Sequence, residues 1–367
     1  MESLAESFFK GKKVLVTGHT GFKGSWMCQA LLMLGADVAG YALEPPTEPS
    51  LFQLCGISRH MMAKKGDIRD LGHLNRVFLE AKPDIVIHMA AQPLVRKGYQ
   101  NPVLTYDTNV MGTVNVLECI RRNLSVRSFL NVTTDKVYCN KEWEWGYREC
   151  EELNGHDPYS NSKSCSELVT YSFKESFLKD AGIAVSTARA GNVIGGGDFA
   201  ADRIVPDCIR SVQERKAVIV RNPHSVRPYQ HVIEAVMAYL MIAGKQYEDA
   251  SCAGSYNVGP DETDCRTTGD LVELFCQKWM EACNEPVEWI SQKGGMPEPY
   301  EANYLKLDCS KIKKTFGWRP CWNIETAMEK VVEWTNIYFE GGDISGCMER
   351  QIKEYFGSFL CTMAARE

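Results

Sequence analysis

Tyr159 and Lys163 stand four positions apart in the segment YSNSK, a spacing that places both side chains on one face of a helix. A neighbouring ammonium favours the phenolate form of tyrosine and lowers its pKa towards neutrality. Such a pair can take a proton from a sugar hydroxyl during hydride transfer. The same spacing also occurs in pairs on helix surfaces, so the chemistry depends on what surrounds this pair.

Thr134, Asp135 and Lys136 follow an apolar run at 129–133 that is expected to be a strand. Ligands of doubly wound sheets bind outside the carboxyl ends of strands, so these residues and Tyr159 are expected around one pocket. Asp135 is a candidate acid or a structural carboxylate at a strand end. Lys136 can act as a base only when neutral, which requires burial or a neighbouring cation; otherwise it anchors the substrate or Asp135.

A glycine-rich loop comes directly after the run KVLV near the start of the chain, with Gly18, Gly21 and Gly24 at Gly-x-x-Gly-x-x-Gly spacing. The first glycine allows a tight turn, the second lets the backbone approach a pyrophosphate, and the third allows close helix packing. The helix that follows offers free N–H groups and the positive end of its dipole to the phosphates. The loop therefore predicts a dinucleotide site.

The residues that usually determine specificity for NAD or NADP do not distinguish the two cofactors in this sequence. The strand expected at 37–43 ends without the carboxylate that usually binds the ribose hydroxyls, and Glu44 lies slightly too late. The basic residues within 64–69 are expected to be a solvated charge cluster rather than ligands of a 2′-phosphate. Asp67 could accept a hydrogen bond from the adenine amino group or cap the next helix. These residues alone favour neither cofactor.

Short β-rich runs alternate with helical patterns over the first 190 residues. Strands are expected at 13–16, 37–43, 85–89, 129–133 and 183–188, and helices at 21–34, 70–81, 102–122 and 159–178. Buried strands separated by helices indicate an α/β fold with a Rossmann-type, doubly wound parallel sheet.

The regular alternation of strands and helices ends after residue 190, where short elements mix with turns. We expect residues 1–190 to form a dinucleotide-binding domain, with returning segments at about 228–260. In that stretch a helix at 232–243 and a strand at 255–258 are expected to rejoin the sheet. Residues 191–367 are expected to form mainly a smaller C-terminal domain that binds substrate.

Composition excludes several classes of protein. The 367 residues are 44% hydrophobic and 24% charged, with a net charge of −6 that predicts no basic surface for nucleic acid or membrane. No apolar run approaches the ~20 residues of a membrane span, and the first residues do not resemble a secretory signal. The 15 cysteines form no Cys-x-x-Cys pair, so free buried thiols are expected rather than disulfides or zinc ligands. A cytoplasmic protein without a metal is expected.

These motifs and the chain length resemble the extended short-chain dehydrogenase/reductase family. Thr134 and Asp135 are similar to the nucleotide-sugar 4,6-dehydratases, whose commoner motif is Thr-Asp-Glu; Lys136 departs from it. Lys136 at this position resembles the branch of the family that acts on CDP-glucose. Six segments resemble the same branch: HTGFKGSW, HMAAQPLV, TTDKVY, GHDPYSNSK, ARAGNVIGGGDFAADRIVPD and VRPYQHV. The resemblance implies NAD as cofactor, CDP-glucose as substrate, a homodimer paired through the helices at 102–122 and 159–178, and a product used for surface polysaccharide.

The resemblance also implies roles for single residues. Tyr159 would take the C4 hydroxyl proton, Thr134 would hydrogen-bond the C4 oxygen, and Lys163 would hold the nicotinamide ribose. Asp135 would protonate the departing C6 hydroxyl, and Lys136 would remove the C5 proton.

Ligands of the cofactor and the substrate follow from the same resemblance. The cofactor would be bound by Gly18, Gly21, Phe22, Gly24, Asp67, Ile68, Ala90, Ala91, Tyr159 and Lys163. The substrate would be bound by Thr134 and, at its diphosphate, by Asn192, Arg203 and Arg227, which are chemically suited to phosphate.

Two alternatives stay open. Another nucleotide-sugar 4,6-dehydratase or a 4-epimerase would share the loop and the tyrosine–lysine pair, but an epimerase needs neither the acid at Asp135 nor a C5 base. A non-catalytic dinucleotide sensor is a different class, and such proteins typically lose the tyrosine or the lysine. Thr134–Lys136 therefore favours dehydration, and the presence of Tyr159 and Lys163 favours an enzyme.

Overall fold

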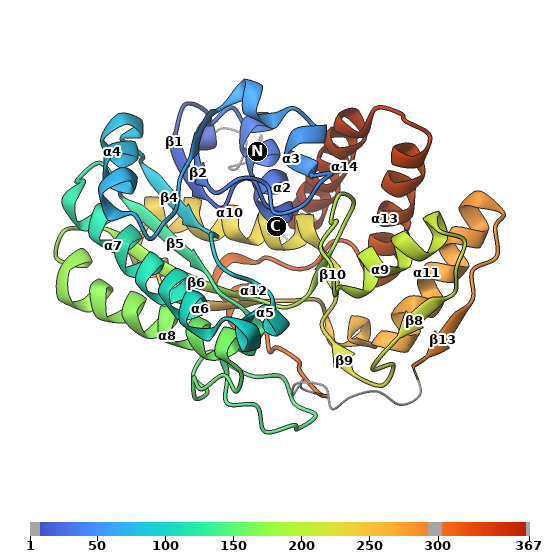
Figure 1. Ribbon diagram of the computed structural model, residues 1–367. Coiled ribbons are helices and arrows are strands. Elements are labelled where there is room, and N and C mark those ends of the chain that lie inside the picture. Colours follow the sequence, from blue (N-terminus) through green and yellow to red (C-terminus); the bar gives the residue numbers. More distant parts are fainter. Residues whose placement is uncertain (1–7, 293–302, 365–367) are drawn as a thin grey trace.

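A seven-stranded parallel sheet forms the centre of the molecule, in the strand order β11-β6-β5-β4-β1-β2-β3 (Figure 1). The computed structural model describes residues 8–292 and 303–364. The strands of the sheet are β1 (Lys13–Thr17), β2 (Asp37–Ala42), β3 (Met62–Lys65), β4 (Ile85–His88), β5 (Ser128–Val132), β6 (Ala184–Ala190) and β11 (Ser255–Val258). The predicted α/β fold with a doubly wound parallel sheet is confirmed.

Helices cover both faces of this sheet, which explains why every residue of β5 and β6 is buried. α2 and α10 pack together on one face, and α4, α7 and α8 cover the other (Figure 1). The helices of this part are α2 (Phe22–Met33), α3 (Leu51–Leu54), α4 (Leu71–Ala81), α5 (Val95–Gln100), α6 (Pro102–Tyr106), α7 (Gly112–Arg122), α8 (Pro158–Phe173) and α10 (Val232–Glu248).

A smaller region lies beside the sheet, at the right of Figure 1, and has a hydrophobic core of its own between α9, α11 and α13. Its helices are α9 (Ile204–Gln213), α11 (Thr268–Cys283) and α13 (Ile324–Phe339). Its short strands pair in twos: β7 (Val193–Ile194) with β10 (Gln230–His231), β8 (Val218–Val220) with β13 (Trp289–Ser291), and β9 (Val226–Arg227) with β12 (Arg266–Thr267). α12 (Ser310–Phe316) contacts β11 and α14 (Ile344–Ala364) contacts α2, so both join the core beside the sheet.

Most expected elements are present, including the two segments that return to the sheet. α10 packs on β5 and β6, and β11 pairs with β6 at the sheet edge. The edge strand β3 was not predicted, because its sequence MAKK is short and half-exposed and has little apolar signal. The helix expected at 102–122 contains a π-helical turn at Asp107–Met111 between α6 and α7.

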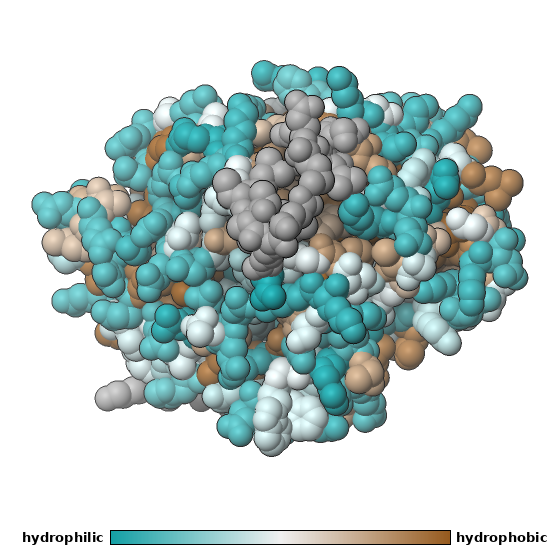
Figure 2. Space-filling view, turned by 180° about the vertical axis from the view of Figure 1, so that it is seen from behind, coloured by the Kyte–Doolittle hydropathy of each residue, from teal (hydrophilic) through white to brown (hydrophobic). Residues whose placement is uncertain are grey.

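The surface and the cysteines agree with the composition. The cysteines from Cys28 to Cys347 are free thiols, and Cys28, Cys119, Cys208 and Cys276 are buried as predicted. In these ranges no helix is long and apolar enough to cross a bilayer. Figure 2 shows a mainly hydrophilic face with dispersed apolar residues.

Glu234 in α10 anchors the C-terminal part of the chain. One carboxylate oxygen accepts hydrogen bonds from the N–H groups of Cys321 and Trp322, and the other accepts one from the Tyr355 hydroxyl at 2.5 Å. Burial raises the pKa of Glu234 to about 7, although these hydrogen bonds favour the charged form. The folded chain therefore holds a proton on this carboxyl at pH values where the unfolded chain has lost it.

Glu234→Gln should remove a pH-dependent part of the folding stability. Because the pKa is higher in the folded state, the wild-type free energy of unfolding should fall as pH rises from the ordinary glutamate pKa to about 7, by about 3 kcal/mol from this group. Glutamine keeps an acceptor for the two N–H groups and does not titrate. Urea unfolding of both proteins across this pH range measures the effect, and parallel pH profiles would contradict it.

Candidate active site

The glycine-rich loop joins β1 to α2 and brings three backbone segments close together. Gly18 has a φ of +78°, and a Cβ atom there would lie 2.8 Å from the backbone nitrogen of Ala90. A Cβ atom on Gly24 would lie 2.1 Å from the Gly18 carbonyl oxygen. The predicted roles of Gly18 in a tight turn and Gly24 in close packing are thus confirmed.

This loop has the properties that a pyrophosphate site requires. A Cβ atom on Gly21 would meet only the Gly18 carbonyl oxygen, at 3.5 Å, so the space beside it is otherwise open. α2 has no side-chain cap and no acidic residue in its first turn, which Phe22 opens. The N–H groups and the positive dipole end are therefore available to an anion, and the loop fits a dinucleotide phosphate.

The ends of β1 and β4 are tied together at the same edge. The Thr17 hydroxyl accepts hydrogen bonds from the N–H groups of Met89 and Ala90 and contacts His88 Nδ1 at 2.7 Å. These contacts fix the backbone of the strand end, after which Ala91 is partly exposed. Ala90 and Ala91 lie where small side chains let a cofactor approach, and binding by them stays a prediction.

Asp67 and Ile68 lie after β3. The Asp67 carboxylate accepts a hydrogen bond from the Arg69 N–H and pairs with its guanidinium at 2.6 Å. The interpretation of Asp67 as a helix cap is wrong, because Asp70 caps α4 by accepting from the N–H of His73. The Ile68 residue is buried and its carbonyl oxygen accepts a hydrogen bond from the Asn115 amide, so cofactor binding by Ile68 stays a prediction.

The other charges near the second strand behave as predicted from the sequence. Lys64 pairs with Glu80, and Lys65 pairs with Glu44 on the surface. Both pairs are partly or fully solvated and engage ordinary partners, so these lysines form a solvated charge cluster.

Thr134, Asp135 and Lys136 form a tight turn immediately after β5. Thr134 caps the short 3₁₀ helix Asp135–Val137, and its hydroxyl donates to Asp135 Oδ1 at 2.9 Å. Lys136 Nζ donates to the same Oδ1 at 3.0 Å and to Asn192 Oδ1 at 3.3 Å. Asp135 is buried, and its Oδ2 atom has no hydrogen-bond partner among the described residues. The turn thus presents a carboxylate oxygen that can still receive or give a proton.

Tyr159 and Lys163 occupy the first turns of α8, which begins at the Asp157 cap. Lys163 Nζ donates to the Val132 carbonyl oxygen at 3.1 Å, which ties α8 to the end of β5. Thr134 and Asp135 both lie close enough to Tyr159 to affect its pKa, so the predicted group of Thr134, Asp135, Lys136 and Tyr159 is brought together.

The expected effect of Lys163 on Tyr159 is corrected by the structure. Burial raises the pKa of Tyr159 to about 12, opposed by the Thr134 hydrogen bond and by the charge of Arg203. Burial also lowers the pKa of Lys163 to about 8. In the chain alone, the nearby positive charges do not offset desolvation of the phenolate.

The three expected diphosphate ligands differ in their surroundings. Asn192 contacts Lys136, as described above. Arg203 pairs with Asp198 at 3.1 Å and is close enough to Tyr159 to influence its pKa. Arg227 is buried in β9 and donates to the carbonyl oxygen of Val226 at 2.9 Å. Asn192 and Arg203 therefore lie near the catalytic group, while the diphosphate role of all three stays a prediction.

Two groups near the site were missed from the sequence. Glu167 of α8 and Arg189 of β6 form a buried ion pair, and Glu167 also accepts a hydrogen bond from the Thr133 hydroxyl. Lys23 lies in the first turn of α2 and donates to the Tyr239 hydroxyl at 3.2 Å. A lysine beside the positive end of a helix is unfavourable, and this was the signal available in the loop sequence.

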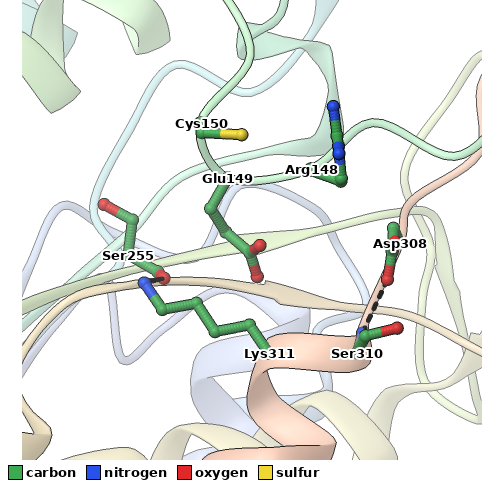
Figure 3. Close-up of a pocket in the computed structure, with 7 residues that line it drawn as sticks. All are labelled: Arg148, Glu149, Cys150, Ser255, Asp308, Ser310 and Lys311. Atoms are coloured by element: carbon green, nitrogen blue, oxygen red, sulfur yellow. Dashed lines mark hydrogen bonds between the residues drawn. The ribbon is translucent and has the colours of Figure 1, made fainter.

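A separate hollow of about 430 Å³ is drawn in Figure 3. The Lys311 ammonium donates to the Ser255 carbonyl oxygen, and the Ser310 N–H donates to the Asp308 carboxylate, both at 2.8 Å. Its lining consists of Arg148, Glu149, Cys150, Ser255, Asp308, Ser310 and Lys311. None of these is among the predicted site residues, and we assign this hollow no part in the reaction.

The sequence is similar to known nucleotide-sugar dehydratases over most of its length. The family model described as GDP-mannose 4,6 dehydratase matches residues 15–331. The CDP-glucose 4,6-dehydratase of Salmonella typhimurium is 45% identical over 359 residues, which cover 96% of this chain and 98% of that protein.

Solved structures are similar over most of the chain as well. The dTDP-glucose 4,6-dehydratase of Bacillus anthracis, in complex with NAD, has a TM-score of 0.73 and 20% identity, and the match covers 91% of this chain and 100% of that one. The UDP-glucose 4-epimerase of Thermus thermophilus, in complex with NAD, has a TM-score of 0.73 and 25% identity, with 88% and 98% covered.

Proposed function

The chain belongs to the GDP-mannose 4,6 dehydratase family, and from this premise we propose that it converts CDP-glucose to CDP-4-keto-6-deoxyglucose with NAD as cofactor. The observation that carries dehydration, rather than epimerisation, is the Asp135–Lys136 pair beside Thr134 and Tyr159. An epimerase has no use for an acid and a base at that position. Identity of 45% to a CDP-glucose 4,6-dehydratase supports the choice of substrate.

The first step is removal of hydrogen from C4 of the sugar. Tyr159 takes the C4 hydroxyl proton, while Thr134 hydrogen-bonds the C4 oxygen and Lys163 holds the nicotinamide ribose. When bound, NAD supplies the acceptor for the C4 hydride and its donor to C6, and its positive ring has the charge that lowers the pKa of Tyr159. The resulting 4-ketone makes the C5 proton acidic.

Water is then lost across C5 and C6, and the Asp135–Lys136 pair can supply both proton transfers. One proton shared across their 3.0 Å hydrogen bond gives either an ion pair or a carboxylic acid beside a neutral amine. In the second form Lys136 removes the C5 proton and Asp135 protonates the departing C6 hydroxyl. Lys136 returns a proton to C5 when the hydride is delivered to C6.

The protons balance through Thr134. After turnover Tyr159 has gained a proton and Asp135 has lost one. The Thr134 hydroxyl donates to Asp135 and lies beside Tyr159, so it can relay that proton back. The C4 hydroxyl proton thereby replaces the one that left with the water, and the site is ready for the next substrate.

Lys136→Met should stop exchange of the C5 proton with solvent and lower turnover by about 10²–10⁴-fold. Lys136→Arg is the matched control, because arginine keeps the cation that could anchor Asp135 but cannot act as a base. Neither variant should exchange the C5 proton with solvent, as measured by mass spectrometry of the reaction in deuterated water. Normal C5 exchange in Lys136→Met would remove this residue from the mechanism.

Incubation with NAD and each of CDP-, dTDP-, UDP- and GDP-glucose tests the reaction and the base preference together. Loss of one water from CDP-glucose alone, read by mass spectrometry, is the expected result. Loss of water from a different nucleotide sugar would retain dehydration and overturn the CDP assignment. A C4 epimer without loss of water would instead identify an epimerase.

The proposal extends to the division of the chain, its oligomeric state, its location in the cell and the use of its product. We assign residues 1–190, with returning segments at about 228–260, to the cofactor and residues 191–367 mainly to the nucleotide sugar. Exposed apolar side chains on neighbouring helices support a homodimer; these are Val103 of α6, Leu168 and Tyr171 of α8, and Phe177 just after it. Free cysteines support the cytoplasm. A 4-keto-6-deoxy product suits deoxysugar synthesis for surface polysaccharide, such as a lipopolysaccharide O-antigen.

A further inference from the structure

Lys23 is a charged group at the site that the reaction above does not use. It is the second residue of α2, directly after the glycine-rich loop, and its side chain turns towards α10. Its ammonium donates to the Tyr239 hydroxyl at 3.2 Å and lies 5.4 Å from the centre of that ring. No carboxylate within residues 8–292 and 303–364 forms an ion pair with it.

The charges that face Lys23 are mainly positive. Lys163 of α8 and Arg203, just before α9, act on it as cations, whereas Asp135 acts as the opposing carboxylate. Asp135 is already paired with Lys136, and Arg203 is paired with Asp198. Tyr239 of α10 is a neutral partner, because burial raises its pKa well above the ordinary range.

A partly buried amine among cations, at the positive end of a helix, is costly for the ligand-free chain. The cost is offset when an anion enters, and the same loop has the shape that fits a pyrophosphate. We infer that Lys23 is a diphosphate ligand, whose ammonium adds a side-chain contact to those of the backbone. This inference rests on the proposed function, which supplies two candidate diphosphates: one in NAD and one in CDP-glucose.

Binding through Lys23 should be linked to proton uptake. Burial, followed by the charges of Arg203 and Lys163, lowers the pKa of Lys23 to about 7, so the free amine is partly neutral at neutral pH. An anion beside it raises that pKa again, and the complex gains a proton. Affinity should be greatest below the pKa and should fall as pH rises above about 7.

Calorimetric titration of NAD alone, and of CDP alone, tests this without turnover. In wild type we expect proton uptake in buffers of different ionisation enthalpy and weaker binding at about pH 9 than at about pH 6. Lys23→Met should weaken the diphosphate ligand about 10–100-fold at the lower pH and reduce the proton uptake. Lys163 titrates in both proteins, so their difference reports Lys23.

Two further variants separate this role from a structural one. Lys23→Arg should keep the affinity but lose the proton uptake, because arginine stays charged. Lys12→Met is the matched control, since Lys12 lies over the ring of another α10 tyrosine, Tyr247, at 4.8 Å; its binding should equal wild type. An effect on NAD alone assigns Lys23 to the cofactor, and one on CDP alone assigns it to the sugar nucleotide.

The inference is overturned if Lys23→Met binds both ligands with wild-type affinity and proton uptake. It is also overturned if that variant binds more weakly but keeps the wild-type proton uptake, because the amine would then act only through structure. Neither outcome depends on which sugar nucleotide is dehydrated, so failure of the proposed function is recognised separately by the substrate panel.

Discussion

Tyr159→Phe should reduce dehydration of CDP-glucose by about 10²–10⁴-fold, the usual contribution of a general base. Phenylalanine keeps the ring within α8 and removes only the hydroxyl, which lies beside Thr134. The C4 proton then has no acceptor, so neither C4 oxidation nor the later loss of water can proceed. Turnover at saturating substrate, with the product followed by mass spectrometry, measures the effect.

Tyr106→Phe provides the matched control for this prediction. Tyr106, at the end of α6, also donates its hydroxyl to a residue of α8, Asn161, at 2.9 Å. Loss of that hydrogen bond should leave turnover within a few-fold of wild type. Turnover of Tyr159→Phe within the same range would show that another group takes the C4 proton.

Arg189→Met should lower the free energy of unfolding by about 3–5 kcal/mol, because it leaves the buried carboxylate of Glu167 without its cation. The two side chains are each 3% exposed, and Arg189 also donates to the Tyr138 hydroxyl at 3.0 Å. Glu167 accepts from Thr133, the residue before the catalytic turn, so local order at Thr134 should suffer as well. Urea denaturation measures the loss.

Two comparisons make this stability prediction specific. Replacing both Glu167 and Arg189 with methionine should cost less than Arg189→Met alone, since no buried charge is left unpaired. Arg121→Met breaks the pair of Arg121 with Glu118 on the surface and should have a far smaller effect. Equal losses for Arg121→Met and Arg189→Met would contradict the account.

Local patterns in the sequence predicted the parts of the site that lie close together along the chain. The glycine spacing predicted the turn at Gly18 and the close packing at Gly24, and alternating apolar runs predicted the parallel sheet. Thr134 and Tyr159 were expected at one pocket because strand ends and helix starts meet at one edge. Each of these inferences depends on backbone geometry, which short segments determine well.

Properties set by distant residues could not be predicted in this way. The pKa of Tyr159 depends on how completely the surrounding chain excludes water, and burial outweighs the nearby lysine that sequence spacing suggested. Lys23 acquires its setting from Tyr239, more than 200 residues further along the chain. The sequence left Asp67 open as a ligand of adenine or as a helix cap, and the structure gives the cap to Asp70.

The central claim is that hydrogen leaves C4 and the same hydrogen returns at C6 while one water is lost. CDP-glucose carrying deuterium at C4 tests it directly, with the enzyme and NAD, by mass spectrometry and NMR of the product. The account predicts a 4-keto-6-deoxy sugar that has lost one water and retains the deuterium at C6. Product without the label, or label still at C4, would contradict it.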